Sequence, residues 1–193
     1  HMAAGRTFEL LYGNFTRYVK DERTGKWSVE PWYAESWDQP DPKTVVMKLK
    51  KGVKFQDGTV FNADVAKWNF DRMLTHKIST IRQDIGVLDT VSIVDDMTVR
   101  LNLKAPAGGL LTILSDSAPR GWIISKAAVD KLGEGFGRNP VGSGPMQFVH
   151  WKDGDNITLK RWDGYWENGE DGKPLPYIDG IEYRIMPDAT VKL

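Results

Sequence analysis

The histidines and the paired acidic residues are the side chains of this sequence whose types could support catalysis or metal binding. Apart from His1 at the start of the chain, the histidines are His76 and His150, which lie far apart and lack a companion ligand at helical spacing. Neither the zinc pattern H-E-x-x-H nor the nucleophile pattern G-x-S-x-G occurs. Asp95 and Asp96 fall in a predicted turn, where solvated carboxylates are far commoner than a catalytic pair. The sequence therefore predicts no enzyme active site and no cofactor.

Two glycine-containing acidic segments could be considered for calcium. The segment "DGDN" at 153–156 lacks the spaced ligands and the terminal glutamate of an EF-hand loop. The segment "GYWENGEDGKPLPY" is better interpreted as a surface loop. We therefore predict no metal site.

The stretch "NPVGSGPMQFVHW", residues 139–151, combines a stiff corner with a strand pattern. A phosphate-binding glycine loop normally leads into a helix, whereas alternating apolar residues follow Pro145 here. We therefore expect the prolines to fix φ, and Gly142 and Gly144 to adopt backbone geometry closed to other residues. The glycines would also leave room for the main chain of a ligand.

The composition is that of an ordinary globular protein. Lys plus Arg equals Asp plus Glu at 26 each, so the sequence predicts no nucleic-acid or anionic-membrane partner. The absence of cysteine excludes disulfides and thiolate chemistry. No apolar stretch approaches the ~20 residues of a membrane span. No secretory signal is visible, but the initial "HM" resembles a cloning remnant, so any native leader could have been removed.

Tryptophan is frequent, with 8 residues in the chain. We expect most of them to pack in the core, where the indole buries a large apolar area. One or two could instead line a cleft and stack on a ligand.

Helical and strand periodicities predict an α+β fold. The clearest helix begins after Asn62 as N-cap and carries an apolar stripe of Ala63, Ala66, Phe70 and Met73. Residues 8–19 predict a short helix running into a strand, residues 107–114 a short helix or turn, and residues 121–133 a strand entering a helix. Residues 20–28 predict a polar turn, and the segment from Glu30 predicts irregular structure followed by a Pro-Asp turn. Alternating residues predict strands at 45–49, 91–93, 99–103, 146–151, 156–162 and 181–186.

Several segments, in order, resemble the family 5 extracellular solute-binding proteins of ABC importers, which bind dipeptides, oligopeptides or nickel. The matching stretches are "VEPWYAESWDQPDPKTVVMKLKKGVKFQDGTVFNADVAKWNFDRML", "DDMTVRLNLKAP", "NPVGSGPMQFVHWKDGDNITLKRWDGYW" and "YIDGIEYRIMPD". Two departures are Ser143, where the family often has threonine, and Met146, where an aromatic residue is usual.

The resemblance implies a periplasmic-binding-protein-like fold of type II, cluster C, with mixed, mostly antiparallel sheets and flanking helices. The chain would be a fragment holding most of lobe I and lacking the second lobe. Residues 1–4 would be a cloning and leader remnant, 5–138 mainly the family's extra subdomain, and 139–193 part of the main sheet. The corner at 139–145 would lead from the subdomain back into that sheet.

The resemblance also implies a function without catalysis. The parent protein would be periplasmic or extracellular, with or without a lipid anchor. It would capture an oligopeptide or similar small solute, a nickel chelate included, and present it to a membrane permease. The alternatives are an oligosaccharide-binding module and the ligand-sensing domain of a transcription regulator. Exposed sheet edges could also pair two copies of the chain.

Five residues are predicted to contact the ligand. By position, 79–84 and 118–125 match cleft-lining regions of the family, which selects Arg82, Arg120 and Trp122. Arginine binds carboxylates through two hydrogen bonds, and tryptophan stacks on rings or alkyl chains. Ser143 and Gly144 belong to the corner where a ligand's main chain could approach.

Overall fold

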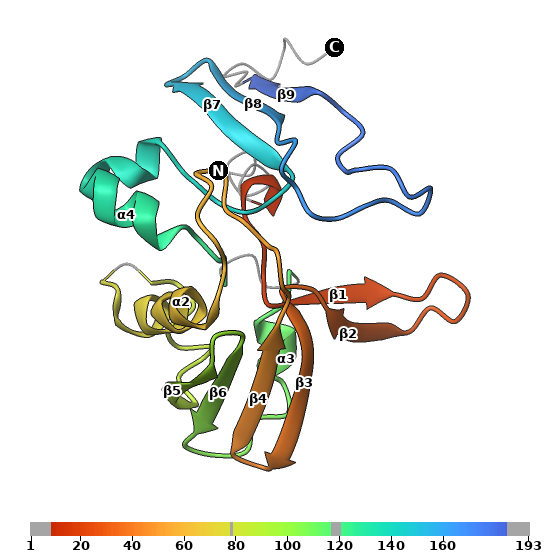
Figure 1. Cartoon of the computed structure of the whole chain (residues 1–193), viewed down its shortest axis with the longest axis vertical. Coiled ribbons are helices and arrows are strands. Elements are labelled where there is room, and N and C mark those ends of the chain that lie inside the picture. Colours follow the sequence, from red (N-terminus) through yellow and green to blue (C-terminus); the bar gives the residue numbers. More distant parts are fainter. Residues whose placement is uncertain (1–8, 78, 117–120, 185–193) are drawn as a thin grey trace.

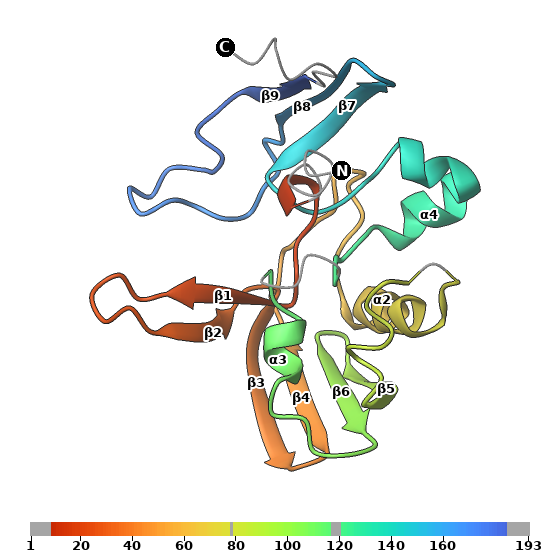
Figure 2. The same cartoon turned by 180° about the vertical axis from the view of Figure 1, so that it is seen from behind.

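The structure is a computed structural model that describes residues 9–77, 79–116 and 121–184. Three sheets, each with only antiparallel strand pairs, are accompanied by short helices (Figure 1). The four-stranded sheet and the three-stranded sheet lie at opposite ends of the long axis, with α2 and α4 on one side between them (Figure 2). The predicted α+β class is confirmed.

The four-stranded sheet has the order β3–β4–β6–β5. Its strands are β3 (Ala34–Asp41), β4 (Thr44–Leu49), β5 (Leu88–Asp95) and β6 (Thr98–Leu103). Val45, Met47 and Leu49 all face the core because side chains of a strand alternate between its two faces. The predicted strand at 45–49 and the hairpin around Asp95 and Asp96 are confirmed.

Helix α2 (Ala63–Thr75) covers this sheet and lies against β5 and β6. Asn62 caps it as predicted, because its side-chain oxygen accepts a hydrogen bond from the backbone N–H of Val65 at 3.0 Å. The apolar stripe is fully buried, and Phe70 stacks on Phe15 with ring centroids 4.3 Å apart. Burying a side chain of this size contributes roughly 1.5–3 kcal/mol to stability.

Strands β1 (Thr16–Lys20) and β2 (Trp27–Pro31) form a two-stranded ribbon that projects from the body in both views (Figures 1 and 2). Trp27 stacks on Tyr18 with ring centroids 5.0 Å apart. A helical turn at 9–11 precedes β1, in agreement with the expected helix running into a strand. The base of the ribbon is tied down by a parallel bridge between Thr16 and Ser115.

Helices α3 (Leu110–Ile113) and α4 (Lys126–Leu132) confirm the short helices expected in these regions. Helix α4 is capped by Ser125 and continues into the 3-10 helix η1 (Gly133–Arg138). The strand expected before α4 is wrong. Residues 121–125 form only an isolated bridge between Ile123 and Gly13, because no longer partner strand lies beside them in the described part of the chain.

The three-stranded sheet consists of β7 (Met146–Lys152), β8 (Asn156–Arg161) and β9 (Gly180–Arg184) in that order. These strands were all predicted. Their inner face forms a second core with the beginning of the described chain. The fully buried members of this core are Leu11, Tyr12, Ile124, Met146, Ile157 and Leu159.

Two strands escaped prediction, because residues 20–28 were interpreted as a polar turn and the segment from Glu30 as irregular. β2 is almost entirely exposed and ends at Pro31, so no buried alternation marks it. β3 contains Pro40, which is tolerated because β3 is an edge strand whose register shifts between Asp38 and Asp41.

Most tryptophans pack into the structure, as expected. Trp27 and Trp151 are exposed, whereas the others are half-buried, namely Trp32, Trp37, Trp68, Trp122, Trp162 and Trp166. Within the described residues, none of the helices has the length and apolar character needed to cross a membrane.

Candidate functional site

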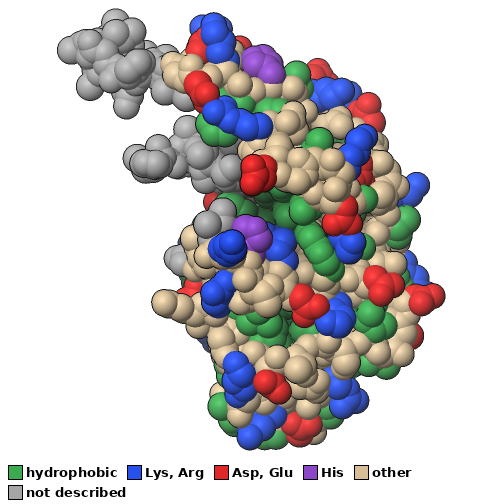
Figure 3. All heavy atoms as spheres, turned by 90° about the vertical axis from the view of Figure 1, so that its left-hand side faces the viewer, with side chains coloured by type: hydrophobic (Ala, Val, Ile, Leu, Met, Phe, Trp, Pro, Cys, Tyr) green, Lys and Arg blue, Asp and Glu red, His purple; other side chains and the backbone are tan. Residues whose placement is uncertain are grey.

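Trp122 forms a wall shared by two hollows. The first, of about 180 Å³, lies at the C-terminal end of α2 and is lined by Arg72, Met73, His76, Ser79, Thr80, Ile81 and Trp122. The second, of about 190 Å³, is lined by Glu9, Asn14, Trp32, Asp116 and Trp122. On the face that carries α2 and α4, apolar side chains lie in a recess between the upper and lower parts of the molecule (Figure 3). A half-buried indole that lines two hollows is suited to contact a small molecule in either of them.

The buried side chain of Asn69 on α2 positions the segment that carries Trp122. Its Nδ2 donates to the carbonyl oxygen of Ile124 at 3.1 Å, and its Oδ1 accepts from the backbone N–H of Ile124 at 3.0 Å. The backbone N–H of Ile123 donates to the carbonyl of Gly13 at 2.9 Å. The Trp122 ring also packs on the Tyr12 ring, with centroids 5.7 Å apart. Trp122 is therefore held between α2 and residues 12–13.

Arg72 supplies the positive charge of the first hollow. Its Nη2 donates to the carbonyl oxygen of Trp122 at 3.4 Å, and its guanidinium lies 6.0 Å from the ring centroid of Trp68. Burial lowers the pKa of the Arg72 guanidinium, while Tyr12 acts in the opposite direction. Arginine stays charged at physiological pH all the same. The Nε of Arg72 is buried and has no hydrogen-bond partner among the described residues.

The second hollow is acidic and has aromatic walls. Asp116 is anchored because its Oδ1 accepts a hydrogen bond from the backbone N–H of Tyr18 at 2.7 Å. Asn14 donates from Nδ2 to the carbonyl of Ser115 at 3.1 Å. The carboxylate of Glu9 completes the lining, so this side of Trp122 carries two acidic groups.

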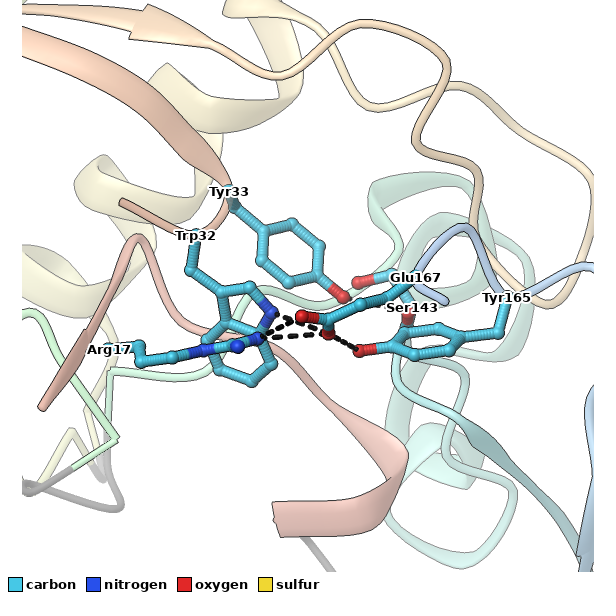
Figure 4. Close-up of polar contacts among 6 residues, drawn as sticks. All are labelled: Arg17, Trp32, Tyr33, Ser143, Tyr165 and Glu167. Carbon is cyan, nitrogen blue, oxygen red and sulfur yellow. Dashed lines mark hydrogen bonds and ion pairs between the residues drawn. The ribbon is translucent and has the colours of Figure 1, made fainter. Parts of the chain in front are cut away.

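Trp32, the other aromatic wall, is fixed by a network around Glu167 (Figure 4). Glu167 accepts two hydrogen bonds from Nη2 of Arg17, at 2.7 and 2.9 Å, and one from the Tyr165 hydroxyl at 2.7 Å. The indole N–H of Trp32 donates to the same carboxylate at 3.4 Å. The Arg17 guanidinium lies 4.8 Å from the Trp32 ring centroid. The network joins the ribbon to the loop after β8.

Tyr33, which follows Trp32 in the chain, forms a hydrogen bond with the corner at 139–145. Its hydroxyl donates to the carbonyl oxygen of Ser143 at 2.7 Å, as Figure 4 shows. Burial raises the pKa of Tyr33 to about 12, so the hydroxyl remains a donor at physiological pH.

The structure brings two of the five predicted contact residues to the same region. Trp122 lines both hollows. Arg82 is exposed, and its guanidinium donates to the carbonyl of His76, a lining residue of the first hollow. Arg120 lies outside the described residues.

Ser143 and Gly144 lie apart from the hollows, within the packed corner. Ser143 has no exposed surface. Neither Gly142 nor Gly144 has a positive φ, so the expected special backbone geometry is wrong. The physical reason for glycine is close packing, because a Cβ would lie 1.9 Å from the Leu11 carbonyl oxygen at Gly142 and 2.5 Å from the Leu10 carbonyl oxygen at Gly144. The room expected for a ligand's main chain is filled by residues 10–12, and a ligand contact at Ser143 or Gly144 stays a prediction.

Other chemistry finds little support in the described part of the chain. No group of three or more His, Cys, Asp or Glu side chains is placed to hold a metal ion there. The acids of "DGDN" form ion pairs, Asp153 with Arg138 at 2.7 Å and Asp155 with Lys152 at 2.7 Å.

Most residues that line the two hollows were not predicted from the sequence. Glu9 and Asn14 belong to one short stretch, whereas Trp32, Arg72 and Asp116 come from three others, and these stretches meet only in the folded chain. One signal was available for Arg72, which follows Trp68 by one helical turn on the amphipathic helix α2.

The comparisons with known proteins now decide the family. The profile described as "Bacterial extracellular solute-binding proteins, family 5 Middle" matches residues 28–193, most of the chain. The chain belongs to this family. As a family 5 protein, it is 36% identical over 161 residues to the glutathione-binding protein GsiB of Pectobacterium atrosepticum. The match covers 82% of this chain and 30% of that relative, so the chain spans about a third of the relative's length.

Solved structures of similar proteins share the fold. The solute-binding protein MoaA of Agrobacterium tumefaciens R10, in complex with mannopinic acid, has a TM-score of 0.84 and 29% identity, covering 97% of this chain and 37% of that one. The oligopeptide-binding protein AppA of Bacillus subtilis, in complex with a nonapeptide, has a TM-score of 0.74 and 26% identity, covering 98% and 36%. The expected periplasmic-binding-protein-like fold is confirmed for this family 5 chain.

Proposed function

We propose that this chain contributes to the capture of a small solute for an ABC importer, without catalysing a reaction. The observation that carries the proposal is the double hollow around Trp122 in a chain of the solute-binding family. Aromatic walls with a few fixed polar groups are typical of small-molecule sites. The family's extracellular description supports a periplasmic or extracellular location, with lipid anchoring of the whole protein as a further expectation.

The solute is proposed to be an oligopeptide or a similar small molecule. One relative is a glutathione-binding protein, and two similar structures hold mannopinic acid and a nonapeptide. A similar structure of NikA from Brucella suis, 28% identical, holds Fe(III)-EDTA, which keeps a metal chelate within the proposed class. Trp122 and Arg82 are proposed contacts on this side of the solute, together with Arg120.

The proposed organisation follows the separation of the sheets. Residues 5–138 would form mainly the extra subdomain of lobe I, and 139–193 part of its main sheet. The separation of the four-stranded from the three-stranded sheet supports this division. In the complete protein, solute would favour a closed arrangement of two lobes, and a membrane permease would recognise it.

The test is an NMR titration of the 15N-labelled chain, in which each tryptophan indole N–H gives its own resonance. Glutathione and trialanine at millimolar concentration are expected to shift the Trp122 indole resonance, identified by its loss in Trp122→Phe. The exposed Trp151 indole on β7, which lines neither hollow, is the internal control and should not move. An unmoved Trp122 resonance with every peptide, or an equal response to maltotriose, would contradict the proposal, the latter favouring an oligosaccharide-binding module.

A further inference from the structure

The half-buried side chain of Gln56 ties its own loop to two other segments of the chain. Its Nε2 donates to the carbonyl oxygens of Met146 at 2.6 Å, Gly144 at 3.2 Å and Leu11 at 3.4 Å. Its Oε1 accepts a hydrogen bond from the backbone N–H of Gly142 at 3.2 Å. Both the donor and the acceptor end of this amide are therefore used, on segments that lie far apart in the sequence.

The glycine corner depends on Gln56 for much of its hydrogen bonding. The carbonyl oxygens of residues 141–146 all accept hydrogen bonds, and Gln56 supplies the donor for three of them. Its backbone N–H donates to Gly142 at 2.9 Å, and its side chain serves Gly144 and Met146. The other donors are the backbone N–H groups of Ser125 and Trp162 and the hydroxyl of Tyr33.

Leu11 connects this arrangement to Trp122. Its carbonyl oxygen accepts from the Gln56 side chain and from the backbone N–H of Gly144, the latter at 2.9 Å. Tyr12 follows Leu11 and packs its ring on Trp122, with centroids 5.7 Å apart. Leu11 and Tyr12 are both buried, and because buried side chains are close-packed, a displacement of this segment would be transmitted to the Trp122 indole.

Resting on the proposed function, we propose that Gln56 is a positioning residue for solute binding, which acts on Trp122 through Leu11 and Tyr12. Gln56 is not among the described lining residues of the two hollows beside Trp122. It lines a separate hollow of about 330 Å³. Its effect on the solute is therefore indirect, because its amide fixes the backbone from which the Tyr12 ring reaches Trp122.

The contacts of Gln56 require an amide. A carboxylate of the same shape would keep the acceptor for the N–H of Gly142, but it would face three carbonyl oxygens without a donor. Methionine has a similar length and lacks both the donor and the acceptor. Gln56→Glu and Gln56→Met therefore remove the donor with and without an added negative charge.

The experiment applies the NMR titration with trialanine to the whole 193-residue chain and to Gln56→Met. Without the amide, the Trp122 indole resonance should move or broaden before any solute is added. The affinity for trialanine should fall about fivefold, which is the size of effect that a residue coupled to a binding site typically has. Gln56→Glu should lower the affinity at least as much, because its charge also repels the carbonyl oxygens.

The control variant is Asn62→Ala, which also lowers stability because it removes the N-cap hydrogen bond of α2. It should keep the affinity of the unaltered chain for trialanine. An equal loss of affinity in Asn62→Ala and Gln56→Met would overturn the positioning role, because the effect would then follow general stability.

A double-mutant cycle tests the route through Tyr12. Tyr12→Leu removes the ring that packs on Trp122 and keeps an apolar side chain. Because Gln56 is proposed to act through this ring, Gln56→Met should weaken trialanine binding less in the Tyr12→Leu chain than in the unaltered chain. Fully additive losses of affinity would overturn the proposal.

The unaltered chain provides a second measurement if Gln56→Met does not fold. Coupling between two sites is reciprocal, so trialanine that binds at Trp122 should shift the side-chain NH₂ resonances of Gln56. Gln39, exposed on β3, carries the same group and should not respond. A response of Trp122 without any response of Gln56 would overturn the positioning role.

The outcomes separate this inference from the proposed function. An unchanged affinity for trialanine together with an unmoved Trp122 resonance in Gln56→Met would overturn the positioning role and leave solute binding intact. If the Trp122 resonance of the unaltered chain responds to no peptide, the proposed function is wrong. The Trp122 resonance of Gln56→Met without solute then still decides whether Gln56 positions Trp122.

Discussion

The backbone of Gly142 packs directly against the carbonyl group of Leu11, so closely that a Cβ on Gly142 would lie 1.9 Å from the Leu11 oxygen. Two segments more than a hundred residues apart thereby meet at the second core. The backbone N–H of Gly144 donates to the same carbonyl oxygen at 2.9 Å, which closes the contact. The corner at 139–145 is thus shaped by the beginning of the described chain.

Gly142→Ala should therefore destabilise the fold by about 2 kcal/mol or more, because overpacking against backbone atoms cannot be relieved by turning a side chain. The matched control is Gly108→Ala, since a Cβ added at Gly108 would have nothing within 4 Å and the residue has no positive φ. Its effect should stay within about 0.5 kcal/mol. Urea denaturation followed by tryptophan fluorescence measures both. Similar effects of the two substitutions would refute the packing explanation.

The elements that could be predicted from the sequence are those whose side chains follow a period. Helix α2 was predictable because its cap residue and apolar stripe agree, and β4 because its buried residues alternate. β2 and β3 were not, because an exposed ribbon and a proline-containing edge strand bury too little to show a period.

Of the candidate site, the sequence could predict only a residue that a single matching segment contains. Trp122 was found through its position in the family resemblance, without any contact being known. Arg72 and Trp32, in contrast, share these linings with Trp122 from distant segments whose proximity depends on tertiary packing. The glycines of the corner were noticed, but their reason, the approach of Leu10 and Leu11, could not be read from local sequence.

Glu167→Gln should destabilise the chain by about 1–2 kcal/mol, because it removes the charge from a half-buried network that serves Arg17, Trp32 and Tyr165. The Arg17 and Glu167 side chains are only 31% and 21% exposed, so solvent screens the pair incompletely. Thermal unfolding of variant and parent at pH 7 measures the loss.

Asp71→Asn provides the control for Glu167. Asp71 pairs with Lys67 at 2.6 Å on α2, but their side chains are 48% and 36% exposed. An exposed pair of this kind contributes less than about 0.5 kcal/mol. If both variants lose the same stability, the network around Glu167 has no special role in fixing Trp32.

Asp57 should make stability depend on pH below about 4. Burial pushes its pKa upward, but hydrogen bonds from Ser125 and Thr59 outweigh burial and hold the pKa of Asp57 below its usual value of 3.8. A carboxyl whose pKa is lower in the folded state stabilises the protein fully above its unfolded pKa and loses that effect as pH falls through the folded pKa. The stability contributed by Asp57 should therefore be complete above about pH 4–5 and decline below 3.8.

The check is a series of urea unfolding curves between pH 7 and pH 2.5 for the parent chain and Asp57→Asn. The variant should be less stable at neutral pH, and the difference should shrink as the pH falls. Asp89→Asn, at an exposed position of β5, controls for the removal of one negative charge. Parallel curves for the parent and Asp57→Asn would contradict the expectation.

Asn69→Ala should lower both the stability of the chain and its affinity for solute. The fully buried Asn69 side chain accepts a hydrogen bond from the N–H of Ile124 and donates one to the carbonyl oxygen of the same residue. Leaving buried polar groups without partners costs about 1–3 kcal/mol each. Loss of these two hydrogen bonds should also free the segment that carries Trp122. The Trp122 indole resonance should then broaden or move, and its response to trialanine should weaken several-fold.

The control is Asn62→Ala on the same helix, which removes only the N-cap. It should cost about 1 kcal/mol of stability and leave the Trp122 resonance unchanged. An Asn69→Ala chain with an unaltered Trp122 resonance and unaltered peptide response would show that Trp122 is positioned by the Tyr12 and Gly13 contacts instead.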